Sequence, residues 1–177
     1  MSVAIAEIYE SVRATIDSTV RPANTDTYDA GDMVANAVAA ENVVPLIFSA
    51  AGFGTGHGVV RRALLYRDST TQTNASFRLH LFSSEPVIGA GDNEAFAIGS
   101  GRNHLTSIDF NMTAAGAPFP GTADRIKVGT LSSEVNFDLY NNGPNERRIY
   151  GLLQVLAAYT PGESEFFEVT LELAAAK

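Results

Sequence analysis

Side chains capable of acid–base, nucleophilic or metal chemistry are few in this sequence and stand far apart. The three histidines, His57, His80 and His104, lack the His-x-His or His-x-x-x-His spacing that brings two imidazoles to one metal ion. The chain has no cysteine, and no Gly-x-Ser-x-Gly segment holds a serine nucleophile on a strained turn. We therefore expect no catalytic residue, no metal site and no cofactor, and predict that the protein is not an enzyme. A Ser/His/Asp triad assembled only by the fold is the remaining enzymatic alternative.

Two segments place polar side chains where they could bind a ligand or support local structure. The loop Asp26–Asp32 holds three carboxylates, and calcium favours oxygen-rich loops. Because the EF-hand spacing is missing, we favour a tight turn in which the aspartates of Asp29–Asp32 accept backbone N–H bonds. His80 is out of phase with the apolar residues of Ser76–Phe82, which predicts a place on the less apolar face of a strand, hydrogen-bonded to a neighbour.

The charge balance argues against a nucleic acid partner, and the N-terminal sequence pattern argues against a membrane span. With 20 acidic and 12 basic residues, the net charge of −8 would repel a phosphate backbone. The apolar residues of Met1–Val20 are interrupted by Glu7, Glu10, Arg13 and Asp17, so this stretch resembles neither a signal peptide nor a membrane span. We expect a water-soluble protein made in the cytoplasm.

Short alternating or apolar segments separated by turn residues predict an all-β fold. Residues 11–20 alternate with period two and are rich in β-branched side chains, which predicts a strand. About ten strands at this spacing are typical of an antiparallel sandwich or barrel. The further predicted strands are Met33–Val38, Val43–Ser49, Gly58–Tyr66, Ser76–Phe82, His104–Asn111, Arg125–Leu131, Glu134–Tyr140, Arg148–Tyr159 and Glu165–Leu173.

Two of these predictions depend on the choice of period. Tyr150–Tyr159 is almost continuously apolar and could form a buried helix, but we prefer a central strand that is covered on both faces. Phe166–Leu173 alternates apolar with polar residues, which predicts a strand with one wet face.

The chain divides into an N-terminal arm, residues 1–10, and a single sandwich domain, residues 11–177. The arm is a short helix or an extended tail whose apolar side chains need cover, which a neighbouring subunit could provide. Arg61-Arg62 and Arg147-Arg148 are the adjacent basic pairs; each is expected to open a strand, where it meets an acidic partner or keeps a sheet edge soluble. The candidate interface residues are Val3, Ile5, Ile8, Tyr9, Arg61 and Arg62.

The segment Thr19–Val34 resembles an opening segment of a family of tailed-phage virion proteins. A second similar block is Ser76–Phe82, followed by Pro86 and Gly91–Phe96. With the late strands Leu153–Tyr159 and Pro161–Leu173, the resemblance covers most of the chain from residue 18 onward. Some proteins of this kind resemble the jelly-roll cement proteins that stud capsids, commonly as trimers.

The resemblance implies a jelly-roll sandwich that decorates a phage capsid. The expected partner is the major capsid protein on the outer surface of the head, and the expected assembly is a homo-oligomer, with a trimer favoured. Ser2–Tyr9 would then be the capsid-facing arm. The alternative is a receptor- or carbohydrate-binding jelly roll on a virion appendage, with a site on loops that carry Tyr28, Phe53 and Asp92.

Overall fold

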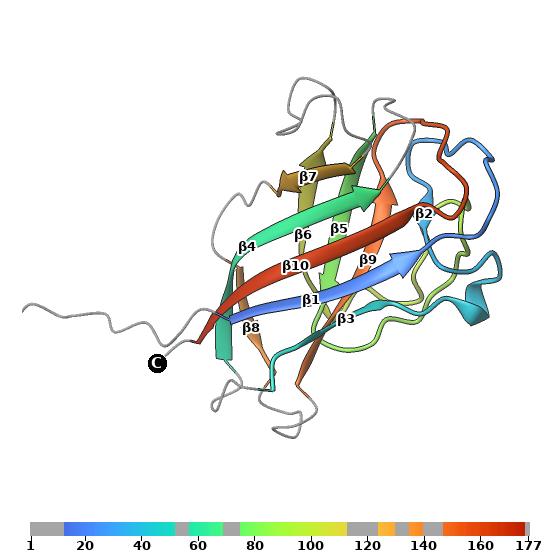
Figure 1. Cartoon of the computed structure of the whole chain (residues 1–177). Coiled ribbons are helices and arrows are strands. Elements are labelled where there is room, and N and C mark those ends of the chain that lie inside the picture. Colours follow the sequence, from blue (N-terminus) through green and yellow to red (C-terminus); the bar gives the residue numbers. More distant parts are fainter. Residues whose placement is uncertain are drawn as a thin grey trace, which may run out of the picture.

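A computed structural model describes residues 13–51, 57–68, 75–112, 124–129, 135–139 and 147–175 (Figure 1). These residues form ten strands and one short 3-10 helix, so the predicted all-β class is confirmed. The elements are β1 (Arg13–Val20), β2 (Met33–Val34), η1 (Ala40–Asn42), β3 (Leu46–Ser49), β4 (His57–Asp68), β5 (Ser76–Phe82), β6 (His104–Asn111), β7 (Asp124–Val128), β8 (Val135–Asp138), β9 (Arg148–Val155) and β10 (Phe166–Ala175).

The strands lie in two antiparallel sheets packed face to face (Figure 1). The first sheet has the order β1-β10-β4-β7, and β8 also pairs with β4; the second has the order β2-β9-β5-β6, and β3 also pairs with β9. Because β7 and β8 share one neighbour and β2 and β3 share another, the ten strands fill eight positions. An eight-position sandwich in which the chain passes back and forth between the sheets is a jelly roll.

Period-two alternation directs the core side chains of β10 inward. Phe167, Val169 and Leu171 are fully buried, whereas Glu168 and Thr170 are only half-buried on the opposite face. The prediction of a strand with one wet face is therefore confirmed.

The apolar segment after Arg148 forms a central strand because both of its faces are covered. In β9, Leu153 packs in the main core between the sheets, and Leu152 packs in a smaller cluster with Met33 and Phe82. The preference for a strand over a helix is confirmed, but β9 ends at Val155, before the predicted end at Tyr159.

The predicted strands 33–38 and 43–49 are too long, because the backbone between them bonds to loops instead of to a ladder. The Ala35 N–H donates to the Asp92 carboxylate, and the Val44 N–H donates to the Asn36 side chain. Asn and Asp side chains compete in this way with sheet hydrogen bonds. Only Met33–Val34 and Leu46–Ser49 remain as strands.

Polar side chains of β1 close the gap to β3 at one side of the sandwich. The Ile47 N–H donates to Asp17 Oδ2 at 2.6 Å, and the Ser49 N–H donates to Thr15 Oγ1 at 3.0 Å. These bonds use β3 donors that would otherwise offer an open edge to another chain. Since Thr15 and Asp17 point inward, the alternate residues Ile16 and Val20 face outward, where they are 58% and 48% exposed.

Candidate protein-binding surface

The outer face of the first sheet carries a row of mostly apolar side chains in register across four strands. Directly opposed residues of antiparallel strands share a face. One row runs from Ile16 through Thr170 and Leu64 to Val128, so it crosses β1, β10, β4 and β7. Val128 is 48% exposed at its far end, and Leu64 and Thr170 are half-buried.

A second apolar group lies two rows away on the same face. Val20 of β1 is opposite Phe166 of β10, and the Phe166 ring contacts the Tyr66 ring edge-on, with centroids 6.0 Å apart. Phe166 and Tyr66 are only half-buried, so both rings remain accessible. We define the outer face by these two groups, with Glu168 between them.

Charge on the outer face is acidic and unevenly paired. Glu168 lies between the two apolar groups, opposite Ser18 on one side and Tyr66 on the other. Further along the same strand, Glu172 Oε1 accepts from Arg62 Nη2 at 2.5 Å. Glu172 is therefore neutralised within the chain, whereas Glu168 is not.

The predicted interface residues are only partly located by the structure. Val3, Ile5, Ile8 and Tyr9 lie outside the described residues. Arg62 lies at the end of the outer face, where it forms an ion pair with Glu172. Arg61 lies at an irregularity in the pairing of β4 with β10, so no residue of β10 is directly opposite it.

The expectation that these arginines open a strand at a sheet edge was wrong. They lie within β4, and β4 is hydrogen-bonded to β10 on one side and to β7 and β8 on the other. The long run of pairing along β4 begins at His57, before the arginines.

The residues of the outer face were not predicted from the sequence. The sequence nevertheless contains a sign of this surface, because β4 contains Leu64-Leu65 and β10 contains Phe166-Phe167. Adjacent apolar residues in a strand point to opposite faces, and here only the inner face meets the core. Recognising it as one surface requires the strand register, which joins segments about 100 residues apart in the case of Leu64 and Thr170.

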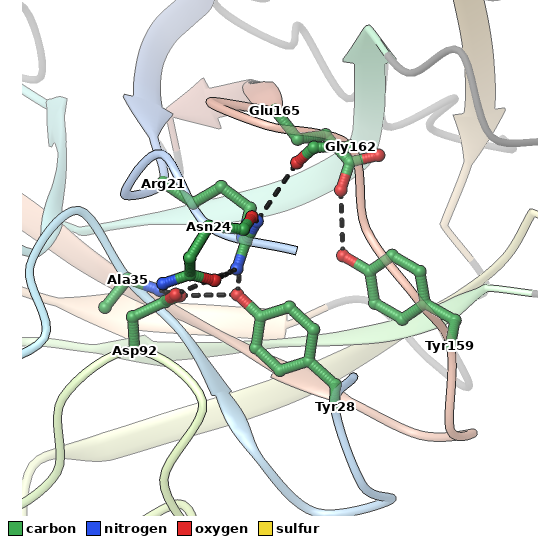
Figure 2. Close-up of polar contacts among 8 residues, drawn as sticks. All are labelled: Arg21, Asn24, Tyr28, Ala35, Asp92, Tyr159, Gly162 and Glu165. Atoms are coloured by element: carbon green, nitrogen blue, oxygen red, sulfur yellow. Dashed lines mark hydrogen bonds and ion pairs between the residues drawn. The ribbon is translucent and has the colours of Figure 1, made fainter. Parts of the chain in front are cut away.

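A buried polar network fixes the loops at one end of the sandwich (Figure 2). The Arg21 side chain is completely buried, and its five N–H donors are all used. Nε donates to Tyr28 Oη, Nη1 to the carbonyl oxygens of Asn24 and Gly162, and Nη2 to Asn24 Oδ1 and Asp92 Oδ2. One side chain therefore joins three loops.

Asp92 is the anionic centre of this network. Its Oδ1 accepts from Tyr28 Oη at 2.5 Å and from the Ala35 N–H at 3.0 Å, while Oδ2 lies 3.2 Å from Arg21 Nη2. Burial, and then the Asp92 charge, raise the pKa of Tyr28 well above its usual value, so the phenol stays a proton donor.

A second buried group adjoins the first through stacked tyrosines. The Tyr28 and Tyr159 rings are 5.3 Å apart and nearly parallel. Tyr159 Oη donates to Glu165 Oε2 at 2.9 Å, and Arg67 Nε lies 3.5 Å from Glu165 Oε1. Each half thus combines an arginine, a carboxylate and a tyrosine, and together they brace the loops against the core.

This geometry corrects the loop site suggested for carbohydrate binding. Tyr28 is fully buried and Asp92 is 3% exposed, and both use their polar atoms on internal partners. Phe53 lies outside the described residues. Tyr28 and Asp92 are therefore parts of the protein interior, not side chains that a sugar could contact.

The aspartate loop forms the predicted tight turn. The Asp29 N–H donates to Asp32 Oδ2 at 2.7 Å, the Asp32 N–H donates to the Asp29 carbonyl oxygen at 3.2 Å, and Gly31 supplies the positive φ of 104° that such a turn needs. Within the described part of the chain, no three His, Asp or Glu side chains are grouped so that they could hold a metal ion.

His80 lies in a polar cluster on the second sheet. Its Nε2 is 3.1 Å from Gln154 Oε1, and its Nδ1 is 2.9 Å from Ser107 Oγ, which also contacts His104. The predicted hydrogen-bonded position is confirmed. Both ring nitrogens of His80 are thus hydrogen-bonded to neutral side chains, whereas in a Ser/His/Asp triad one of them is bonded to a carboxylate.

The burial of His80 predicts a pH dependence of stability. Burial lowers its pKa from 6.5, so the unfolded chain binds this proton more readily, and stability is lost as the pH falls below about 6.5. We expect thermal unfolding to occur at a lower temperature at pH 5.5 than at pH 7.5, about one unit either side of that pKa. His80→Gln should reduce this difference; an equal difference in the variant would contradict the assignment.

Comparison with known proteins does not indicate a function, so the functional argument depends on the residues described above. No model of a protein family matches the chain, and neither does any curated protein. In the described part of the chain the sole helix is the three-residue η1, which is too short to span a membrane.

Proposed function

We propose that this protein is a phage capsid decoration protein, which binds the outer surface of the major capsid protein lattice and stabilises the head. A trimer is the assembly we favour. The observation that carries the proposal is the outer face of the first sheet, because its apolar side chains stay accessible on a fold that already has a complete core. The resemblance of Thr19–Val34 and Gly91–Phe96 to virion proteins supports the same class.

The outer face has the composition of a protein-binding surface. Aromatic side chains supply much of the binding energy of interfaces, and an accessible apolar patch is typical of such a surface. Tyr66 and Phe166 provide the aromatic contacts, and Ile16, Val20 and Val128 extend the patch to both sides. The net charge of −8 suits a place outside the shell, away from packaged DNA.

Deletion of residues 1–10 tests whether the arm takes part in attachment. The strand β1 begins at Arg13, so the deletion leaves its pairing with β10 intact. We expect the shortened chain to fold and keep its oligomeric state but to lose binding to heads purified without the protein. Co-sedimentation with such heads measures this, and unchanged binding would remove the arm from the mechanism.

A further inference from the structure

The central carboxylate of the outer face has no partner within the described chain. Glu168 is half-buried, and no described residue forms a hydrogen bond or an ion pair with it. Its neighbours along β10 are Phe166 and Thr170, and those across the ladders are Ser18 and Tyr66. None of these side chains carries a compensating charge.

Covering the outer face would bring this carboxylate out of water. A charge that loses its hydration without gaining a partner is strongly destabilising, so a surface of apolar groups alone would bind poorly here. We propose that the partner inserts an arginine or lysine, flanked by apolar side chains, to pair with Glu168. The inference rests on the proposed function, because the partner surface is then that of the capsid lattice.

Arginine suits this position better than lysine. A guanidinium can pair with a carboxylate in its plane while its face stacks on an aromatic ring, and it is more weakly hydrated than an ammonium group. Tyr66 is directly opposite Glu168, and Phe166 contacts Tyr66, so ring surface is available beside the carboxylate.

Charge argues against two other occupants of the face. Two-fold docking of a second copy centred on Glu168 would bring two Glu168 carboxylates together without a cation between them. Residues 1–12 contain Glu7 and Glu10 but no lysine or arginine, so none of their side chains supplies the missing charge.

Binding of heads purified without the protein tests the inference. Glu168→Gln keeps the size of the side chain and removes its charge, and we expect its affinity for the heads to fall on the order of thirtyfold, with a weaker dependence on salt. Glu168→Asp, which keeps the charge, should bind more tightly than Glu168→Gln. Glu41→Gln, an exposed position in η1, makes the same change in net charge and should bind like the wild type.

The outcomes separate the inference from the function. If wild-type protein leaves the heads bare, both fail. If it binds and Glu168→Gln binds equally well, only the ion pair is refuted. Light scattering completes the test by measuring the oligomeric state of Glu168→Gln. If that state changes while head binding does not, the outer face binds a second copy of the chain, and the inference is overturned.

Discussion

Asp92→Ala should lower the free energy of unfolding by about 3–5 kcal/mol, because it leaves a buried charge without its counter-ion. The Arg21 guanidinium would remain fully enclosed, and Tyr28 Oη and the Ala35 N–H would lose their acceptor. In a chain of this size the midpoint of thermal unfolding should fall on the order of 10 °C.

Urea unfolding of Asp92→Ala and of Asp26→Ala measures this cost. Asp26 lies in the same loop as Tyr28, is exposed, and makes no described contact with the network, so its variant should stay within about 0.5 kcal/mol of the wild type. If the two variants were equally stable, the network would not hold the loops as we infer.

The buried network joins the two sequence segments on which the proposed resemblance to virion proteins rests. Arg21 and Tyr28 come from Thr19–Val34, and Asp92 comes from Gly91–Phe96, yet their side chains are in direct contact. These residues stabilise the loops of the fold, whereas the proposed attachment surface lies on β1, β4 and β10. The proposed similarity of those segments therefore concerns the scaffold of the fold more than its partner.

Strand positions were predictable where one face meets the core and the other meets water. The bounds of β5 and β6 agree with the predictions Ser76–Phe82 and His104–Asn111, and in β5 the buried residues Phe77, Leu79 and Leu81 alternate with less buried polar residues. The jelly-roll order was suggested by resemblance alone, since pairing partners such as β1 and β10 are separated by almost the whole chain.

Side-chain partners across loops were not predictable from local patterns. Arg21 and Asp92 are 71 residues apart, and neither residue differs from an ordinary loop residue in its sequence context. The same limit applied to β1. Its alternation predicted a strand with two different faces, but it did not predict that Asp17 and Thr15 point inward and accept hydrogen bonds from β3. Long-range packing decided both cases.

Ile16→Asp should weaken binding to heads by about 2–4 kcal/mol, which is roughly thirtyfold to a thousandfold. Ile16 is 58% exposed and begins the apolar row that continues through Thr170 to Leu64, so a carboxylate there would be desolvated beneath the partner and would add to the acidic charge of Glu168. Since the Ile16 side chain lies outside the core, the free energy of unfolding should change by no more than about 1 kcal/mol.

Val87→Asp is the matched control, because it places the same charge on an even more exposed β-branched position. Val87 is 70% exposed, but it lies in the loop between β5 and β6, outside the first sheet. Its affinity for heads should equal that of the wild type, as measured by co-sedimentation at one salt concentration. Equal losses in both variants would indicate general repulsion of acidic protein by the shell, and no loss in Ile16→Asp would place the contact on another surface.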